Sequence, residues 1–552
     1  MSKNSVEIIP LGGLGEIGKN STLIVYGTNS ILIDAGLKFP EEEMLGVDLV
    51  LPDFSYLKKL PVKPLAIILT HGHEDHVGAL PYLLPDLNIP VYGTPLTINL
   101  VQAKLEEFSI SGCQLNIVKP GGKINLGPFE IEFIRVNHSI PDGVGLYIKT
   151  PIGGIVHSGD FKLDPAPVDG SPTDLNRFSA IGKDKVLVFL SDSTNAEVPG
   201  FSPSERLVGE TLEKIFHQAR RKIIVASFAS HLHRIKQIIE LSKQFGRKIA
   251  VSGRSMKESI EIGRRLNHFD LPEEMIVELF NLKKYQPDEL VVICTGSQGE
   301  PLSALSLLAS GQHKNLSIEA GDTVIIAATP VPGNERAISR IIDDIFRMGA
   351  QVFYEDVSSV HVSGHGYQEE LKLLLTMVNP KFFVPIHGEY RHLVYHSQLA
   401  QEVGLKAENI FILENGDVLD VRPDEAYVSK NVGAGQVFVD GLGIGTVSDL
   451  VLRDRMKLAL DGMVVIAIGI KQPRGELIYG PEIISRGFIH PENSVELLNQ
   501  IKEEVLSLFY EAARFKLIEK AALKEEIKRL VSRLIFKLTR RRPIIVPLII
   551  EL

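Results

Sequence analysis

The sequence predicts an α/β protein in which a strand-rich domain is split by an inserted domain of parallel β/α units and followed by a small C-terminal domain. Three observations predict this fold. Short apolar strands follow one another through the first 160 residues, strand–loop–helix units repeat from about residue 186, and strand character returns after about residue 360. The length of 552 residues also exceeds the roughly 250–300 residues that one core supports.

The first segment contains short strands separated by Gly, Pro and Asn, a pattern typical of stacked antiparallel sheets with few helices. The strands expected here are 6–11, 21–27, 30–36, 65–70, 90–94, 129–136, 143–150 and 153–160.

The middle segment contains apolar strands that each run into a small polar loop and, in most cases, continue with helical periodicity. These units cover 186–195, 222–239, 248–263, 290–308 and 322–342. Parallel β/α sheets bind ligands at the carboxyl ends of their strands, where these loops lie. Strands such as 381–390 return the chain to the first domain, and the last segment, from about 450, has its own strand and a basic helix.

The composition is that of an ordinary globular protein, with 44% hydrophobic and 23% charged residues. Only Cys113 and Cys294 occur, which indicates a reducing compartment. The N-terminus lacks signal-peptide features, and no apolar run approaches the roughly 20 residues of a membrane span. We therefore expect a cytoplasmic protein without membrane association. The net charge of −9 lowers the expectation of nucleic-acid binding without excluding a local basic groove.

Gly13, Gly15 and Gly18 match the G-x-G-x-x-G pattern of dinucleotide-binding loops. That pattern requires a helix next, whose N-terminus receives the phosphate. The following segment, STLIVYG, is β-branched and strand-like. A tight strand–strand connection is therefore the favoured interpretation.

The stretch HGHEDH, residues 71–76, follows an apolar strand and carries the clearest chemical signal. His71 and His73 alternate with a glycine, so that both imidazoles can project the same way. Asp75 and His76 lie one turn later, at the start of an expected helix, and can face a second point. Two metal ions roughly 3.5–4 Å apart are a common hydrolytic arrangement. Surface histidines with a helix cap at Asp75 would explain only part of this pattern.

Further ligands are expected where other apolar runs stop. His138, Asp160 and His387 occupy such positions. Taken singly, each could be a structural residue. Asp160 has two carboxylate oxygens and could bridge two ions.

These motifs resemble the metallo-β-lactamase superfamily, which implies an αββα sandwich. In its dinuclear zinc hydrolases, His71, His73 and His138 would hold one zinc, and Asp75, His76 and His387 the other, with Asp160 bridging. SDSTN with Asp192, HVSGHG with His361 and His365, and PIHGEY with His387 resemble the motifs of β-CASP nucleases. Over nearly the whole chain the sequence is similar to the bacterial ribonuclease J family. The implied domains are 1–200 and 361–448 (metallo-β-lactamase), 201–360 (β-CASP) and 449–552 (C-terminal).

The resemblance implies a ribonuclease with two Zn²⁺ per subunit, with Mn²⁺ or Mg²⁺ as alternative supporting ions. Hydroxide held between the ions would attack the phosphodiester. The expected activities are 5′→3′ exonuclease action on 5′-monophosphorylated single-stranded RNA and internal cleavage, in RNA maturation, including rRNA processing, and in mRNA decay. Asp75 would act through the metal, His365 near the leaving oxygen, and Asp192 by orienting metal-site histidines.

The resemblance also implies a pocket for the 5′-monophosphate and terminal nucleotides, although tight β/α turns would explain each loop alone. Its expected residues are Ser227, Ser230, His231, Leu232, Arg254, Ser255, His361, Val362, Ser363, Gly364 and His365. A structural Ca²⁺ is a further expectation, with Gly46, Asp48 and Asp440 as its ligands.

The basic C-terminal stretch carries an apolar helical face, which we expect to comprise Leu523, Ile527, Leu530, Leu534 and Leu538. It is typical of a solvated helix packed in a small domain, with RNA contact or subunit association as alternatives. The resemblance favours a homodimer or homotetramer through this domain, with RNA-decay proteins as further partners.

Three rival functions differ in what they predict. A small-molecule hydrolase would not need the inserted domain with its SDSTN and HVSGHG motifs. A catalytically inactive RNA-binding scaffold would have lost metal ligands, and none is lost here. DNA as substrate is separated poorly from RNA by the sequence alone.

Overall fold

The computed structural model describes residues 5–41, 43–300, 302–329, 334–355, 357–441, 443–471, 476–489, 495–514 and 520–551. The chain divides into two compact units: Met1–Phe39 with Leu49–Val437, and Pro40–Asp48 with Phe438–Leu552. None of the helices in the described residues combines the length and apolar character that crossing a membrane would require.

The first unit contains two sheets that share one core. The first sheet has the order β22 (Ala426–Asn431), β21 (Asp417–Val421), β1 (Val6–Gly12), β3 (Ser21–Tyr26), β4 (Asn29–Ile33), β6 (Ile67–Ile68), β7 (Val91–Gly93), β8 (Leu115–Ile117). The second has the order β19 (Phe382–Ile386), β13 (Val186–Asp192), β12 (Gly153–His157), β11 (Val144–Thr150), β10 (Phe129–Arg135), β9 (Lys123–Leu126). Apolar side chains of both sheets, such as Ile24, Ile33, Phe133 and Leu146, form one buried cluster between them.

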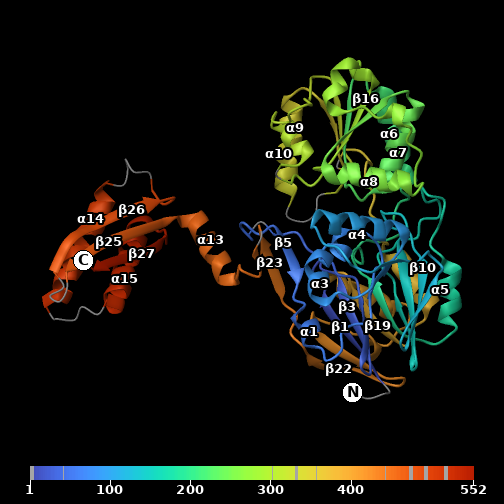
Figure 1. Ribbon diagram of the computed structural model, residues 1–552, viewed down its shortest axis with the longest axis horizontal. Helices are drawn as coiled ribbons and strands as arrows, with labels where there is room; N and C mark the ends of the chain where they lie inside the picture. The colour runs from blue at the N-terminus through green and yellow to red at the C-terminus, as the bar shows by residue number, and fades with distance from the viewer. Residues whose placement is uncertain are drawn as a thin grey trace. The chain divides into compact units, whose positions relative to one another are not determined.

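Helices cover the outer sides of this pair of sheets (Figure 1). The second sheet packs against α5 (Leu175–Gly182), α11 (Gln368–Val378) and α12 (Tyr390–Glu402) through a second buried cluster. In the first sheet, α2 (Glu74–Val77), α3 (Leu80–Leu87) and α4 (Pro95–Glu107) connect the parallel strands β6, β7 and β8. The arrangement is the predicted αββα sandwich. The expectation of antiparallel pairing was wrong for β4, β6, β7 and β8, because these helical crossovers return each strand in the same direction.

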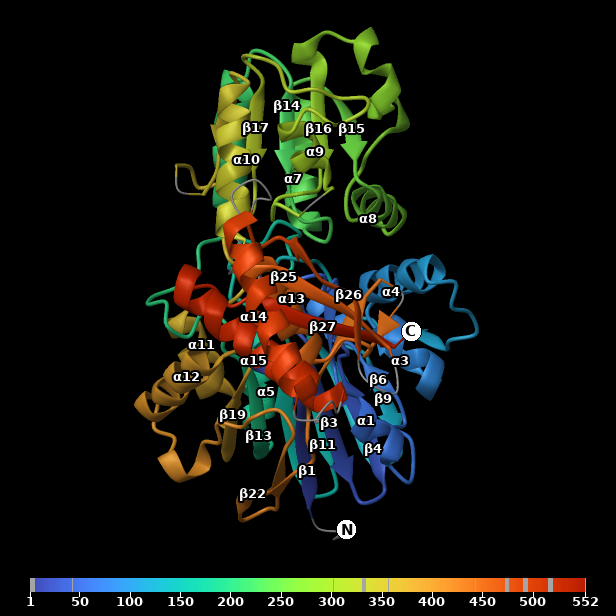
Figure 2. The same ribbon diagram turned by 90° about the vertical axis from the view of Figure 1, so that its left-hand side faces the viewer.

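The inserted domain is a five-stranded parallel sheet between two helical layers. Its strand order is β15 (Lys248–Ser252), β16 (Leu290–Cys294), β14 (Ile223–Ala226), β17 (Thr323–Ile326), β18 (Gln351–Phe353), and Figure 2 shows β14 to β17 side by side. One face packs on α6 (Arg206–Gln218), α7 (Leu232–Gln244) and α8 (Arg254–Arg265). The other packs on α9 (Ala304–Ala309) and α10 (Glu335–Arg347). Residues 186–192, which begin the predicted run of β/α units but fall within the implied domain 1–200, pair with β12 and β19 of the sandwich.

The second unit contains a three-stranded sheet with the order β26 (Glu476–Arg486), β25 (Met463–Lys471), β27 (Ile544–Glu551). Along β25, Val464, Ile466 and Ile468 are buried against α14 (Val495–Arg514) and α15 (Lys520–Thr539). The predicted apolar face of α15 is only partly correct, because the buried positions are Leu523, Ile527, Val531 and Ile535. A spacing of four residues keeps these side chains on one stripe, whereas Leu538 is 49% exposed. Helix α13 (Asp449–Asp461) precedes this sheet.

Candidate metal centre and phosphate pocket

The candidate metal centre collects donors from the ends of several strands of the sandwich. His71 and His73 follow β6, Asp75 and His76 lie in α2, His138 follows β10, Asp160 follows β12 and His387 follows β19. The histidine-rich loop after β6 can pass close to the segment that follows β4, because Gly36 in that segment lacks a side chain. A Cβ at Gly36 would lie 1.6 Å from the carbonyl oxygen of Asp75.

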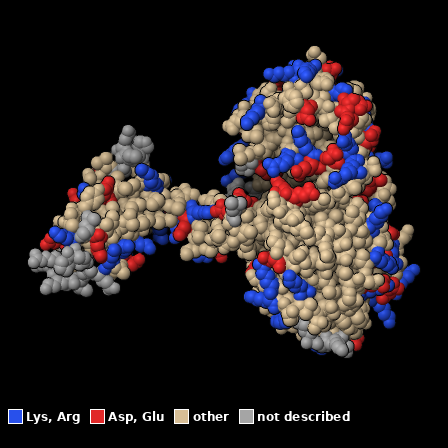
Figure 3. All heavy atoms as spheres, viewed as in Figure 1, with Lys and Arg blue, Asp and Glu red and all other residues tan. Residues whose placement is uncertain are grey.

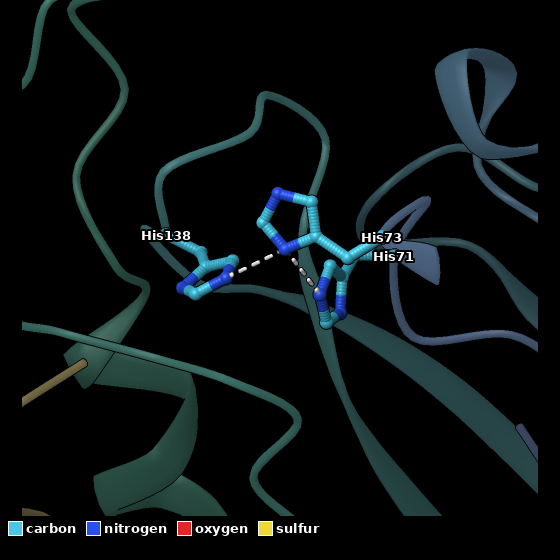
Figure 4. Close-up of side chains that lie close together, drawn as sticks. All are labelled: His71, His73 and His138. Atoms are coloured by element: carbon cyan, nitrogen blue, oxygen red, sulfur yellow. Dashed lines mark hydrogen bonds between the residues drawn. The ribbon is translucent and has the colours of Figure 1, made fainter. Parts of the chain in front are cut away.

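The first donor set consists of three imidazoles (Figure 4). His73 Nδ1 lies 3.0 Å from His71 Nε2 and 3.0 Å from His138 Nε2. His138 Nδ1 lies 2.8 Å from the carbonyl oxygen of Gly364, so this nitrogen carries the proton and donates it. The Nε2 lone pair of His138 therefore points toward the other two rings.

The same reasoning assigns the His71 tautomer. The Thr70 hydroxyl donates to Asp34 Oδ2 over 2.8 Å, so it can only accept from His71 Nδ1, which lies 3.1 Å away. The lone pairs of His71 and His138 then both face His73 Nδ1, which has at most one proton to donate.

These three histidines are neutral, the state in which imidazole binds metal ions. Burial and neighbouring His76 depress the pKa of His71 well below its usual value, and burial likewise depresses the pKa of His138. Burial lowers the pKa of His73 to about 4, against the opposing carboxylates of Asp75 and Asp160. Nitrogens bound to one zinc at ~2.0–2.1 Å stand roughly 3.3 Å apart in a tetrahedral arrangement, close to the separations found here. The donor set fits a divalent cation.

The second donor set combines two histidines with two carboxylates. Asp160 Oδ2 lies 3.2 Å from His76 Nε2, and Asp160 Oδ1 lies 3.1 Å from His387 Nδ1. Asp75 Oδ2 lies 3.3 Å from His387 Nε2 and 3.6 Å from His76 Nε2. His76 Nδ1 is held by Asp34 Oδ2 at 2.8 Å, which directs Nε2 toward the other donors.

Asp160 lies between the two sets. Its Oδ2 atom is 3.7 Å from His71 Nε2 and 3.8 Å from His138 Nε2, in addition to its contacts with the second set. Burial would raise the pKa of Asp160, but the imidazoles of His387 and His76 hold that pKa well below its usual value. Burial would lower the pKa of His76 and of His387, but the Asp160 carboxylate raises both well above the usual value. Cation binding at this set would therefore release protons.

Asp192 and His365 form a pair at the edge of the second set. His365 Nδ1 lies 2.7 Å from Asp192 Oδ2, while Asp192 Oδ1 accepts from the Thr194 hydroxyl over 2.8 Å and lies 3.5 Å from His387 Nδ1. Burial opposes protonation of His365, but Asp192 raises the pKa of that imidazole. His365 is thus a proton donor whose side chain keeps 19% of its surface exposed.

A group of buried polar atoms lies where the inserted domain meets the HVSGHG loop. Four of these atoms have no hydrogen-bond partner among the described residues: Ser227 Oγ, His231 Nε2, Arg234 Nη2 and His361 Nδ1. The rings of His231 and His361 stand 6.3 Å apart. Burial and Arg234 lower the pKa of His231 well below its usual value and the pKa of His361 to about 3. Unpaired buried donors are costly, which makes this group a candidate anion site.

The other predicted pocket residues have different surroundings. Ser363 Oγ accepts from the amide of Asn195 over 2.7 Å, and Leu232 and Val362 are buried in the core of the inserted domain. Ser230 is half-buried. Gly364 holds His138 through its carbonyl oxygen. These positions shape the loops that carry the unpaired atoms.

Arg254 and Ser255 lie at the start of α8 and are exposed. The Arg254 guanidinium pairs with Glu107 of α4 over 2.8 Å, so the structure brings it to α4. Lys104, also in α4, forms an ion pair with Glu74 of the histidine-rich loop. Figure 3 shows charged side chains of both signs along the band where α8 faces α4.

Three residues that support these sites were not predicted. Asp34 fixes both His76 and Thr70 from the end of β4, and an acidic residue that ends an apolar strand is the signal that could have found it. Arg234 is fully buried and pairs with Glu205 over 2.7 Å. No pattern in the sequence marks this arginine among its neighbours on α7. The third, Asn20, lies beside the second donor set.

The residues expected to bind calcium surround an arginine. Arg455 Nη2 bonds the carboxylate of Asp440, and Arg455 Nη1 donates to the carbonyl oxygen of Leu45 over 2.8 Å, next to Gly46. Asp48 Oδ2 accepts from the backbone N–H of Gly441 over 2.7 Å. A calcium ion requires about six to eight oxygen ligands, and a guanidinium already neutralises the Asp440 carboxylate. This arrangement does not fit calcium while Arg455 stays in place.

Four known families match successive parts of the chain. Residues 14–201 match the metallo-β-lactamase superfamily, and residues 220–345 match the β-CASP domain of ribonuclease J. Residues 351–413 match the RNA specificity domain of Zn-dependent metallo-hydrolases. Residues 450–552 match the C-terminal domain of ribonuclease J.

Similar proteins extend over the full length of the chain. Ribonuclease J2 of Bacillus subtilis is 41% identical over 99% of both chains. Ribonuclease J 1 of Streptococcus pyogenes is 40% identical over 100% of this chain and 98% of its own. Ribonuclease J of Helicobacter pylori is 38% identical over 99% of this chain and 79% of its own. A crystal structure of an Enterococcus faecalis protein of unknown function shares the fold, with a TM-score of 0.54 at 15% identity over 75% of this chain and 100% of its own.

Proposed function

The chain belongs to the ribonuclease J family and is a metal-dependent ribonuclease, and we propose that it holds two zinc ions and degrades single-stranded RNA in the cytoplasm. Its substrate is RNA with a 5′-monophosphate, which it shortens from the 5′ end, and it also cuts internally. The observation that carries the metal chemistry is the convergence of neutral histidine lone pairs at His71, His73 and His138, next to the carboxylates of the second donor set.

Divalent ions bound there would supply activated water and neutralise charge on the phosphate oxygens. The residues of the chain do the rest. Asp160 fixes the spacing of the two donor sets, since it contacts histidines of both. His365, held by Asp192, can deliver a proton to the oxygen that leaves phosphorus.

The preference for a 5′-monophosphate is supported by the unpaired atoms of Ser227, His231, Arg234 and His361. His231 Nδ1 accepts from the backbone N–H of Arg234 over 3.3 Å, so its Nε2 carries the proton that can donate to a phosphate oxygen, and Arg234 supplies a fixed positive charge. RNA anchored there would present its first phosphodiester to the metal centre, which accounts for stepwise removal of nucleotides. Internal cleavage would use the same metal centre without this pocket.

The test is a degradation assay on matched oligonucleotides with a 5′-monophosphate RNA end, a 5′-triphosphate RNA end, or a DNA backbone. We expect the monophosphorylated RNA to be degraded fastest. His231→Ala removes a hydrogen bond to a charged group, worth about 1.5–3 kcal/mol, and should reduce the monophosphate preference roughly 10- to 100-fold. Cleavage at internal sites should persist in this variant.

The matched control is His313→Ala, which removes a histidine of the inserted domain that bonds Ser252 outside the group of unpaired atoms. It should retain the wild-type preference. Equal degradation of all three oligonucleotides by the wild-type protein would contradict the proposed pocket.

We also propose that the C-terminal unit associates with further copies of the chain. The sheet face opposite α14 and α15 carries Leu548 and Ile550 of β27, 44% and 51% exposed, and Ile484 of β26, 42% exposed. Exposed apolar patches of this kind mark association surfaces. Leu548→Glu should reduce the mass in solution to that of a single chain in light scattering. An unchanged multimeric mass, or a monomeric wild-type protein, would contradict this assignment.

A further inference from the structure

The glycine-rich segment between β1 and β3 ends at Asn20, and the proposed function gives it no task. Gly13, Gly15 and Gly18 have φ angles of 90°, 72° and 100°. The chain makes a short pairing with β20 (Gly388–Glu389) through β2 (Leu14–Gly15) and then delivers Asn20 to the start of β3. The segment is the tight strand connection that the sequence predicts.

Asn20 faces the second donor set with its side chain. Asn20 Nδ2 lies 3.1 Å from His76 Nε2 and 3.4 Å from Asp75 Oδ2. Since Asp34 holds His76 Nδ1, the nitrogen near Asn20 is the one whose lone pair is directed at a metal ion. The carboxamide therefore stands beside two of the four donor side chains of this set.

The backbone of Asn20 is fixed to the same loop. Its N–H donates to the carbonyl oxygen of Asp75 over 3.0 Å, and its carbonyl oxygen accepts from the N–H of Gly36 over 3.0 Å. The side chain thus starts from an anchored position and has little freedom to leave Asp75 and His76.

Gly13 leaves the space that the carboxamide occupies. A Cβ at Gly13 would lie 2.4 Å from Asn20 Oδ1, which is closer than atoms can approach. At Gly15, which also has a positive φ, a Cβ would have no heavy atom within 4 Å. Both glycines have a positive φ, which glycine adopts without strain. Only at Gly13 would a side chain also collide with Asn20.

We propose that Asn20 is a positioning residue of the second metal site, where its backbone N–H and its carboxamide hold Asp75 in the orientation that binds the ion, beside the Nε2 atom of His76, and that Gly13 makes this contact possible. The inference rests on the proposed two-metal function. Hydrogen-bond partners of metal ligands typically change metal affinity or activity by about 10- to 100-fold when removed. Asp75, which Asn20 bonds, and His76, which it faces, both belong to the second set, so only one of the two ions should be affected.

The experiment measures zinc affinity by competition with a chromophoric chelator at neutral pH, on the full chain. The wild-type protein should bind two ions. Asn20→Ala should bind the first ion as the wild type does and the second roughly 10- to 100-fold more weakly. RNA cleavage by this variant should recover as the zinc concentration rises, because the ligands themselves are unchanged.

Gly13→Ala and Gly15→Ala form a matched pair. Both alanines are strained by the positive φ at their positions. Only Gly13→Ala should weaken binding of the second ion, because only its Cβ collides with the Asn20 carboxamide. Gly13→Ala also carries the test if Asn20→Ala fails to fold, a point that thermal unfolding checks.

Wild-type affinity for both ions in Asn20→Ala would overturn the inference and leave the proposed function standing. Equal losses in Gly13→Ala and Gly15→Ala would overturn the role of Gly13. Uptake of a single ion by the wild-type protein would overturn the two-metal function, and this inference with it.

Discussion

Asp160→Asn is expected to reduce the rate of RNA cleavage at saturating RNA by roughly a thousand-fold or more. Asp160 contacts histidines of both donor sets, and an amide offers one oxygen and no charge in place of two oxygens that share a negative charge. Metal ions contribute several kcal/mol to such reactions, and about 4 kcal/mol at ~1.36 kcal/mol per tenfold corresponds to this loss. Single-turnover cleavage and metal content after dialysis measure it.

The matched control is Asp164→Asn, four residues along the same loop. Asp164 is equally buried, but its carboxylate accepts from the backbone N–H of Ala166 over 2.9 Å and from the Ser204 hydroxyl over 2.9 Å, away from the donor sets. This variant should lose stability and keep its metal ions. An Asp160→Asn protein that cleaves RNA at close to the wild-type rate would refute the central role given to this carboxylate.

Arg234→Met is expected to lower the free energy of unfolding by about 3–5 kcal/mol. The guanidinium is fully buried, bonds Glu205 Oε1 over 2.7 Å and also donates to the carbonyl oxygens of Ala327 and Val360. Removing it leaves the Glu205 carboxylate buried without its charge partner. Urea denaturation followed by circular dichroism measures the loss.

Two further variants separate the charge effect from lost packing. Glu205→Gln combined with Arg234→Met should recover part of the stability, because no charge is then left unpaired. Arg177→Met tests the ion pair between the partly exposed Arg177 and Glu132, whose Nε and Oε1 atoms lie 2.6 Å apart. In this variant the Glu132 carboxylate still has Lys123 as a charge partner, at 3.1 Å. It should cost less than about 1 kcal/mol. Similar losses in Arg177→Met and Arg234→Met would refute the argument from burial.

The metal donors could be predicted from the sequence because each stands where an apolar run stops, and strand ends of a sandwich meet at a common edge. His138, Asp160 and His387 carry this signal, and the structure brings them together with the histidine-rich loop. The sandwich with its inserted domain was confirmed by the family matches. The assigned roles of the individual residues stay predictions.

What could not be predicted depends on contacts between distant segments. Asn20 lies outside any donor motif, and its proximity to His76 depends on a backbone path that four positive φ angles determine, at Gly13, Gly15, Gly18 and Lys19. Arg254 is basic and begins α8 just after the end of β15, yet a neighbouring helix supplies Glu107 as its partner. The apolar stripe of α15 runs through Val531 and Ile535, because the side that faces the sheet depends on packing as well as on periodicity.

The hydrogen bond from His138 to the carbonyl oxygen of Gly364 has a consequence for synthesis of the protein on the ribosome. Translation produces His138 long before the segment that orients it, and His387 is produced later still. A nascent chain that ends within the inserted domain contains the first donor set without its orienting carbonyl, and the second set without one of its histidines. The complete centre therefore forms only after the inserted domain has been translated, so a nascent chain that ends within that domain lacks the complete set of metal donors.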